Sequence, residues 1–263
     1  MQKVISKDGT PIAYEKTGNG PAAILVDGAL TYRAFGPLGA LAKAMERDFT
    51  VYTYDRRGRG ESGDTKPFSP EREIEDLGAM IDAAGGSAFL FGVSSGAAIV
   101  LEAATRLKGI RKIALYEAPF IVDNTREPVA RDYVRRMEEA VNSGNPGVAV
   151  DLFMKTVGVP AGVRLVMRVM PAWKKLKATA HTLPYDFAFV NDHQQGKPLA
   201  VNGWRKITTP AVLLVGGKSP GWVKNGMGEL AKAIPGAQLQ SLEGQTHMVK
   251  ANIVAPVLRE FFS

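Results

Sequence analysis

The chain has 263 residues, of which 45% are hydrophobic and 22% are charged. This composition predicts one globular unit with a sizeable core, and it excludes a collagen-like chain, a disordered chain and a small disulfide scaffold. The absence of cysteine excludes disulfides, thiolate metal sites and cysteine nucleophiles together. Lysine and arginine number 33 against 26 aspartates and glutamates, but they are spread along the chain, so we expect no nucleic-acid partner.

The sequence has no feature that directs a protein to a membrane. Its start, MQKVISKDGT, lacks the apolar stretch of a signal peptide, and no apolar run approaches the length of a membrane span. We therefore expect a cytoplasmic protein with no membrane partner. The sequence leaves the oligomeric state open.

Strand and helix patterns alternate along most of the chain. A strand pair joined at Asp8-Gly9 comes first. Apolar runs typical of buried strands follow at 22–28, 49–55, 87–92, 112–117, 211–217 and 238–244. Apolar spacing typical of helices occurs at 32–47, 71–84, 95–107, 222–234 and in the last residues. This alternation predicts an α/β fold with a mostly parallel, eight-stranded sheet covered by helices on both faces.

Residues 121–205 interrupt this alternation with short helical patterns broken by glycine and proline. Ligands bind at the carboxyl edge of such sheets, so we expect a helical cap over that edge, inserted into a core domain of residues 1–120 and 206–263. A structural extension away from any site is the alternative. Large apolar side chains in the segment suggest a substrate pocket, although they also suit plain packing: Met167, Met170, Trp173, Phe187, Phe189 and Trp204.

A Gly-x-Ser-x-Gly sequence spans Gly92 to Gly96, between a buried-strand pattern and an alanine-rich helix pattern. The string alone is weak evidence, but this position is that of a nucleophile elbow. Such a turn strains the serine backbone and exposes the hydroxyl, while the following helix N-terminus favours an oxyanion. We predict Ser94 as the nucleophile and the N–H of Ser95 as an oxyanion donor. A plain glycine turn is the alternative.

A serine nucleophile needs a base, and His247 is the candidate. It follows the last expected strand, which places it at the same sheet edge as Ser94. The other two histidines, His181 and His193, fall in the helical segment, where we expect surface or pocket-lining positions. The turn after the first buried strand should supply the second oxyanion donor, the N–H of Ala29, unless that turn only shapes the pocket floor.

Four segments together resemble the α/β-hydrolase superfamily over essentially the whole chain. They are the turn at 27–30, the stretch Asp55–Ser62, the elbow at 92–96 and the loop around His247. The resemblance implies an α/β-hydrolase fold and an esterase-like serine hydrolase that needs neither cofactor nor metal. It implies that Asp55–Ser62 is structural support. We expect a small-molecule substrate with an apolar acyl group, bound near Asp27, Leu30, Trp173 and Trp222.

Two positions depart from the superfamily pattern. Asp27-Gly28 stands where most relatives have His-Gly, so a carboxyl lies beside the expected oxyanion site. Ser219 stands where the triad aspartate is expected, and no other acid is present in that loop. Some haloalkane dehalogenases of this superfamily carry the acid after the preceding strand, where this chain has Glu117. We therefore predict a triad of Ser94, Glu117 and His247, with Asp123 as the alternative acid.

The predicted reaction is hydrolysis of a carboxylic ester or a related acyl bond. The same serine site also serves lactone, thioester or C–C bond hydrolysis, acyl transfer and perhydrolysis, and the sequence does not separate these reactions. A weakened hydrolase-fold protein that only binds a ligand is a further alternative. The missing aspartate suggests it, and the retained serine and histidine oppose it.

Overall fold

The protein is described here by a computed structural model that covers residues 1–200 and 203–263. Residues 201 and 202, which belong to the expected 121–205 insertion, lie outside the described residues.

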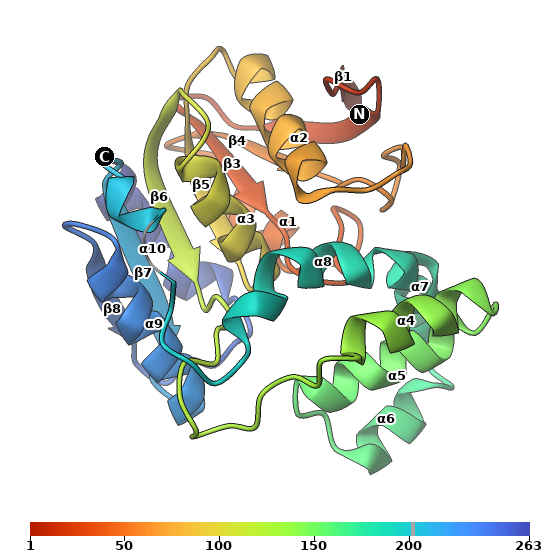
Figure 1. The fold of residues 1–263 in the computed structure, drawn as a ribbon. Helices are drawn as coiled ribbons and strands as arrows, with labels where there is room; N and C mark the ends of the chain where they lie inside the picture. The colour runs from red at the N-terminus through yellow and green to blue at the C-terminus, as the bar shows by residue number, and fades with distance from the viewer. Residues whose placement is uncertain (201–202) are drawn as a thin grey trace.

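An eight-stranded sheet with the order β1-β2-β4-β3-β5-β6-β7-β8 forms the centre of the molecule (Figure 1). The strands are β1 (Gln2–Ile5), β2 (Pro11–Thr17), β3 (Ala22–Val26), β4 (Thr50–Tyr54), β5 (Ala88–Val93), β6 (Ile110–Tyr116), β7 (Ala211–Gly216) and β8 (Gln238–Leu242). β2 runs antiparallel to β1 and β4, and all other neighbours are parallel. The predicted α/β fold with a mostly parallel sheet is confirmed.

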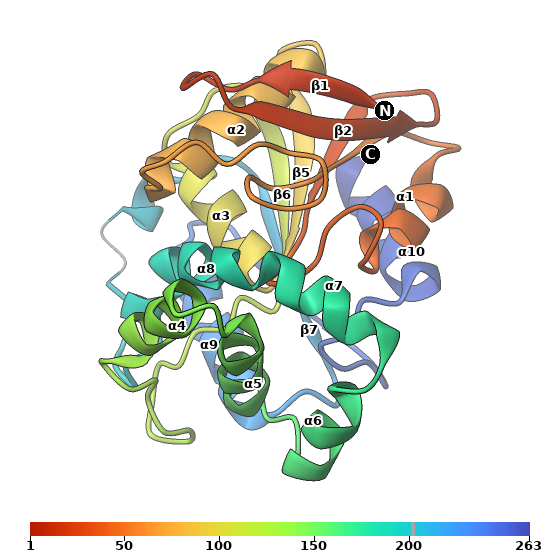
Figure 2. The ribbon, with the colours of Figure 1, turned by 90° about the vertical axis from the view of Figure 1, so that its right-hand side faces the viewer.

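Helices cover both faces of the sheet (Figures 1 and 2). One face carries α2 (Pro70–Ala83), α3 (Ser95–Ala104) and α9 (Gly221–Ala233), and the other carries α1 (Leu38–Met45) and α10 (Ala251–Phe262). Alternate residues of a central strand therefore enter different cores: Leu90 packs on the α3 side and Phe91 on the α10 side. Burial on both faces is why these strands are unbroken apolar runs in the sequence.

The segment between β6 and β7 forms a helical layer beyond the carboxyl ends of the parallel strands (Figure 2). It contains α4 (Tyr133–Asn142), α5 (Pro146–Thr156), α6 (Ala161–Met167), α7 (Pro171–Thr179) and α8 (Leu183–Val190), with single 3-10 turns at Ala180–Thr182, Asn191–His193 and Trp204–Lys206. Of these helices, α8 lies nearest the sheet and packs against α3 (Figure 2).

The helix expected at 32–47 begins later than the sequence predicted. It spans only Leu38–Met45, because the residues before it are held in a turn. Tyr32 and Phe35 exchange backbone hydrogen bonds, and the Arg33 N–H donates to Asp55 Oδ1 at 2.9 Å. These bonds replace the first helical turn, and a local apolar pattern does not reveal them.

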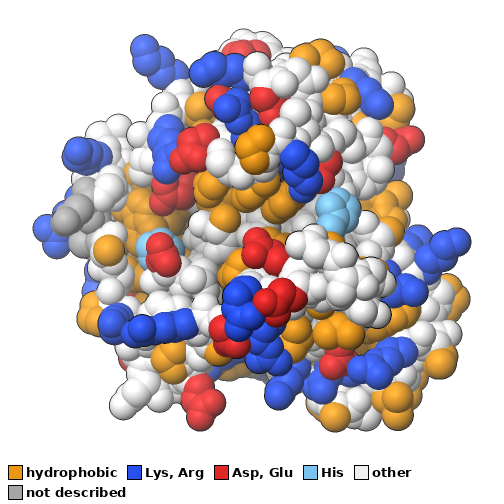
Figure 3. Space-filling model, turned by 45° about the vertical axis from the view of Figure 1, so that its right-hand side comes forward, with side chains coloured by type: hydrophobic (Ala, Val, Ile, Leu, Met, Phe, Trp, Pro, Cys, Tyr) orange, Lys and Arg blue, Asp and Glu red, His pale blue; other side chains and the backbone are white. Residues whose placement is uncertain are grey.

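Charges of both signs are interspersed on the face shown in Figure 3, without a continuous stripe of lysine and arginine there. No helix in the described part of the chain is long and apolar enough to cross a membrane.

Candidate active site

Ser94 occupies the sharp turn between β5 and α3. Its backbone adopts φ 57° and ψ −124°, a conformation that non-glycine residues rarely hold. A Cβ added to Gly92 would lie 2.4 Å from the Gly96 carbonyl oxygen, and one added to Gly96 would lie 2.3 Å from the Val26 oxygen. The turn therefore needs both glycines. It leaves the half-buried Ser94 side chain on the wall of a cavity at the carboxyl edge of the sheet.

Glu117 and His247 meet at the same edge. Glu117 follows β6, is fully buried and places Oε2 2.8 Å from His247 Nδ1. Its other oxygen, Oε1, accepts hydrogen bonds from the Gly216 N–H at 2.7 Å and the Ser219 hydroxyl at 2.5 Å. Burial opposes ionisation, but the hydrogen bonds from His247, Ser219 and Gly216 together hold the pKa of Glu117 below its usual value. Glu117 is therefore a carboxylate at neutral pH.

Ser219 explains how the chain accommodates its departure from the superfamily pattern. It stands where the resemblance leads one to expect an aspartate, and its hydroxyl donates to the carboxylate of Glu117, which follows the neighbouring strand β6. Asp123, the alternative acid, lies on the surface, where it accepts hydrogen bonds from Thr125 and Asn225. The structure thus brings Glu117, and not Asp123, to the imidazole.

Ser94 and His247 line the same cavity, and the side chain of His247 is 49% exposed. The described residues show no hydrogen bond between the two side chains. In free enzymes this contact is often long, and it shortens when substrate binds.

The expected oxyanion donors lie on two elements beside Ser94. Ser95 is the first residue of α3, so its N–H has no acceptor within the helix. Arg59 Nη1 donates to the Gly28 carbonyl at 2.5 Å. In a trans peptide the N–H points opposite to the C=O, so this bond turns the Ala29 N–H away from Arg59. Ala29 lines the cavity together with Ser94.

Two cavities meet at Ser94 and His247. The larger, of about 320 Å³, is also lined by Ser95, Ala29, Glu117 and Trp222. The smaller, of about 210 Å³, is lined by Asp27, Gly28, Ala29 and Thr31 among others. Leu30 lines neither cavity; it is buried at φ 62° and fixes the shape of the turn.

The model of the alpha/beta hydrolase family matches residues 23–251. The chain belongs to this family. It is therefore an enzyme of the hydrolase class that acts on small molecules, and the predicted superfamily and fold are confirmed. An alpha/beta hydrolase from Sphaerobacter thermophilus DSM 20745 is 47% identical over 100% of both chains, with a TM-score of 0.92.

Two more distant structures share the fold. An esterase from Thermogutta terrifontis is 20% identical, with a TM-score of 0.73 and coverage of 99% of this chain and 97% of that one. The enol-lactonase from Burkholderia xenovorans LB400 is 19% identical, with a TM-score of 0.74 and coverage of 99% of both chains.

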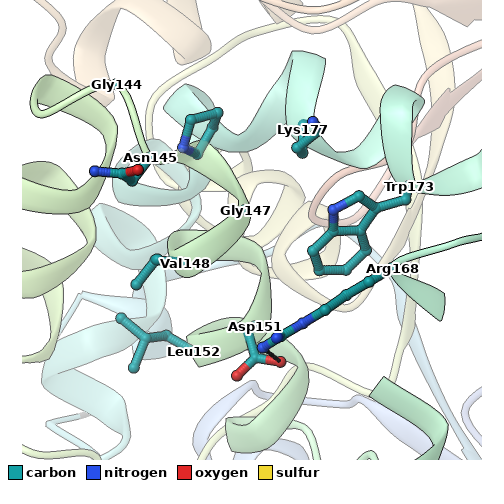
Figure 4. A pocket seen from close by; sticks show the side chains of 10 residues that line it. Gly144, Asn145, Gly147, Val148, Asp151, Leu152, Arg168, Trp173 and Lys177 are labelled. Carbon is teal, nitrogen blue, oxygen red and sulfur yellow. Dashed lines mark ion pairs between the residues drawn. The ribbon is translucent and has the colours of Figure 1, made fainter. Parts of the chain in front are cut away.

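Not every predicted pocket residue of the hydrolase lies near Ser94. Trp222 and Phe187 line the larger Ser94 cavity. Trp173 instead lines a separate cavity of about 550 Å³ between α5 and α7, beside the Asp151–Arg168 ion pair (Figure 4). The remaining large apolar side chains proposed for the pocket, Met167, Met170, Phe189 and Trp204, line neither Ser94 cavity. The sequence does not reveal which side of an inserted helix faces the site.

The structure of the hydrolase also adds residues that the sequence analysis missed. Arg126 and Phe153 line the Ser94 cavity, and Asp186 on α8 accepts a hydrogen bond from the Ser95 hydroxyl at 2.7 Å. One sequence feature could have identified Asp186: it is the single carboxylate within the apolar helix sequence LPYDFAFV, and a carboxylate in such a setting is seldom buried unless it is paired.

The described residues of the hydrolase contain no group of three or more His, Asp or Glu side chains placed to hold a metal ion.

Asp27 places a buried carboxyl at the start of the turn at 27–30, which carries the expected oxyanion donor Ala29. Its side chain is 3% exposed, and burial raises its pKa to about 6, although the Thr31 hydroxyl donates to Oδ1 at 3.0 Å. The ordinary pKa of this group is 3.8, so between pH 4 and 6 the folded state binds more protons than the unfolded state. Asp27 therefore lowers the stability as the pH rises through this window.

We expect Asp27→Asn to increase the free energy of unfolding by about 2 to 3 kcal/mol at pH 8, because no buried charge remains to be desolvated. The gain should shrink steadily as the pH falls towards 4, because Asp27 of the folded protein is then protonated and carries no buried charge. Urea denaturation at pH 4.5 and pH 8 measures this difference. The control Asp192→Asn removes an exposed carboxyl and should show no gain. An equal gain at both pH values would contradict the expected titration.

Proposed function

We propose that this hydrolase cleaves a carboxylic ester or a related acyl bond through a triad of Ser94, His247 and Glu117. The observation that carries the proposal is the 2.8 Å contact between Glu117 Oε2 and His247 Nδ1. A carboxylate at this nitrogen keeps the proton on Nδ1 and leaves Nε2 available as a base towards Ser94.

The reaction follows from these positions. Ser94 Oγ attacks the substrate carbonyl carbon while its proton passes to His247 Nε2, and the N–H groups of Ser95 and Ala29 hold the oxyanion. Collapse of this intermediate breaks the ester bond, and the imidazolium returns the proton to the leaving alcohol. His247 then deprotonates a water molecule that attacks the acyl-enzyme, which releases the acid and restores Ser94. Glu117 stabilises the imidazolium in both steps.

The helical insertion, taken as a cap over residues 121–205, contributes the apolar wall of this site. Phe153, Val157, Phe187 and Val190 line the Ser94 cavity from the insertion side. Such a wall favours an apolar acyl chain. The similar structures include an esterase and an enol-lactonase, so esters and lactones are the first substrates to test.

Covalent labelling tests the nucleophile before any substrate is known. We expect a fluorophosphonate to add one adduct to the wild type and none to Ser94→Ala, read by intact-protein mass. Ser219→Ala is the matched control. The Ser219 hydroxyl is buried and donates to Glu117, so the reagent should not modify it, and this variant should gain the same adduct as the wild type. An adduct that persists in Ser94→Ala would assign the reactive group elsewhere.

The acid of the triad is tested by a second pair of variants. We expect Glu117→Gln to lower kcat/KM roughly 10³- to 10⁴-fold, because an amide cannot stabilise the imidazolium and favours the wrong tautomer. Asp123→Asn should retain the wild-type rate, since Asp123 bonds to Thr125 and Asn225 away from the imidazole. Steady-state hydrolysis of a p-nitrophenyl ester measures both. A larger loss in Asp123→Asn would transfer the role to Asp123.

A further inference from the structure

The larger Ser94 cavity carries unbalanced positive charge. Apart from His247, four ionisable side chains line it: Glu117, Asp186, Arg126 and Lys218. Both carboxylates are engaged within the protein, Glu117 with His247 and Asp186 with two buried arginines. Neither cation has a carboxylate within ion-pair distance over residues 1–200 and 203–263. The protein thus places two cations at its substrate cavity and gives them no counter-ion of its own.

Arg126 is held in a fixed position in this cavity. It lies in the loop between β6 and α4, and its guanidinium carbon stacks 4.0 Å from the centre of the Trp222 ring. Nη2 donates to the Thr156 carbonyl of α5. A guanidinium has five N–H donors, so donors remain for a ligand after this bond. Their planar, forked arrangement matches the two oxygens of a carboxylate.

Because the Arg126 side chain is partly buried, an anion is the ligand that suits this part of the cavity best. Burial lowers the pKa of Arg126 from its ordinary value, and no neighbouring carboxylate opposes this effect. The side chain nevertheless remains a cation at neutral pH. A bound carboxylate would supply the missing charge partner and hydrogen-bond acceptors.

We propose that the substrate carries a free carboxylate, in addition to the bond that is cleaved, and that Arg126 binds it. This inference rests on the proposed function and narrows it to small carboxylate-bearing esters or lactones, such as monoesters of dicarboxylic acids. Phe153 and Val223 supply apolar walls of the same cavity for the chain between the two ends. Lys218, exposed at the mouth, attracts the anion at longer range.

Matched ester pairs test the proposal. Monomethyl adipate and methyl hexanoate share the ester and chain, and they differ in the terminal carboxylate. The same comparison is made with the monomethyl esters of glutarate and pimelate, because the chain length sets the distance between the ester at Ser94 and the carboxylate at Arg126. We expect the wild type to prefer the best acidic ester by about 10- to 100-fold in kcat/KM, and Arg126→Gln to lose that preference.

Three further variants separate binding from structure. Arg126→Lys keeps the positive charge but lacks the planar pair of N–H donors, so it should retain part of the preference for the acidic ester. Lys218→Gln should slow the acidic ester a few-fold at low salt and not at 0.5 M salt. Arg168→Gln is the matched control, because Arg168 pairs with Asp151 across the separate cavity, and it should keep the wild-type preference.

Calorimetric titration with adipate and the uncharged hexanamide gives a readout that does not depend on turnover. Tighter binding of adipate to the wild type, weakened about tenfold or more in Arg126→Gln, would support the carboxylate site even if ester hydrolysis failed. Two results together would overturn the carboxylate site alone. If the fluorophosphonate labels Ser94 but neither the ester assay nor the titration shows a preference for the carboxylate-bearing compound, the proposed chemistry is retained and the carboxylate site is rejected. A preference that persists unchanged in a folded Arg126→Gln would overturn it equally.

Discussion

Ser94→Ala and His247→Ala should each lower kcat/KM for the best ester by about 10⁵- to 10⁶-fold. In the proposed mechanism the serine supplies the atom that bonds to the acyl group, and the histidine moves a proton in every step. When either is missing, the other has no partner to act on. What remains is the contribution of binding and of the oxyanion donors.

The double variant gives the sharper result. Two residues that act as one unit are not additive, so Ser94→Ala/His247→Ala should be no slower than either single variant. Steady-state rates on one ester, with the mass of each preparation verified to exclude traces of wild type, measure this. A double variant whose loss is the product of the two single losses would indicate independent roles and contradict the triad.

Chemical rescue distinguishes the two single variants. The His247 side chain is 49% exposed, so removing it opens a path from solvent towards Ser94. Added imidazole should restore part of the activity of His247→Ala, because it replaces the missing base. It should restore none in Ser94→Ala, where the nucleophile is absent.

The sequence revealed those parts of the fold that local chemistry determines. The central strands were predictable because burial on both faces requires unbroken apolar residues, as in Ala22–Val26 and Ala88–Val93. The elbow was predictable because a turn this tight admits only glycine at 92 and 96. His247 followed from its place after the last strand. Glu117 could be named from the sequence as a candidate partner, and the structure places it against the imidazole.

Contacts between distant segments were beyond the sequence. The Ser219 hydroxyl and the Glu117 carboxylate are separated by about a hundred residues, and only the pairing of β6 with β7 brings them together. The sequence likewise could not show that Trp173 lies away from Ser94 while Arg126 lines the cavity. Those positions depend on how short helices of similar composition turn relative to one another.

Asp186→Asn should lower the free energy of unfolding by about 3 to 5 kcal/mol. Asp186 is fully buried and lies 2.6 Å from Arg56 Nη1 and 2.7 Å from Arg59 Nη2, both fully buried as well. Burial opposes its ionisation, but the two arginines hold its pKa below the usual value. The asparagine variant leaves one of these arginines without a full charge partner in a site that excludes water. A loss of about 3 to 5 kcal/mol is a large share of the free energy of unfolding of a typical domain.

Asp151→Asn is the matched control, because it removes an aspartate that also contacts two arginines. Arg164 and Arg168 lie 3.1 Å from Asp151, with side chains 17% and 50% exposed, so water screens these pairs. We expect a loss of no more than about 1 kcal/mol. Urea denaturation of both variants at pH 7 gives the comparison. Equal losses would show that the burial of Asp186 with Arg56 and Arg59 adds nothing to the strength of these ion pairs.

The pH dependence gives a further check with a defined sign. A carboxyl whose pKa is lowered by folding contributes stability that is present above its unfolded pKa and is lost as the pH falls through its folded pKa. The difference between the wild type and Asp186→Asn should therefore be constant above pH 5 and narrow in more acidic solution. Asp27→Asn differs in sign: there the variant is the more stable protein, and its advantage over the wild type grows as the pH rises from about 4 to above 6.

The same substitution should also slow catalysis, because Asp186 is linked through Arg59 to the turn at 27–30, which carries the proposed oxyanion donor Ala29. Arg59 binds Asp186 on α8 and donates to the Gly28 carbonyl, and that bond sets the direction of the Ala29 N–H. When Asp186 is neutral, Arg59 loses its charged partner and keeps only neutral acceptors such as the Thr182 hydroxyl, so we expect it to hold the Gly28 carbonyl less firmly. We expect kcat to fall about tenfold or more with little change in KM, measured at a temperature where Asp186→Asn is still folded. An unchanged kcat in the folded variant would confine Asp186 to a stabilising role.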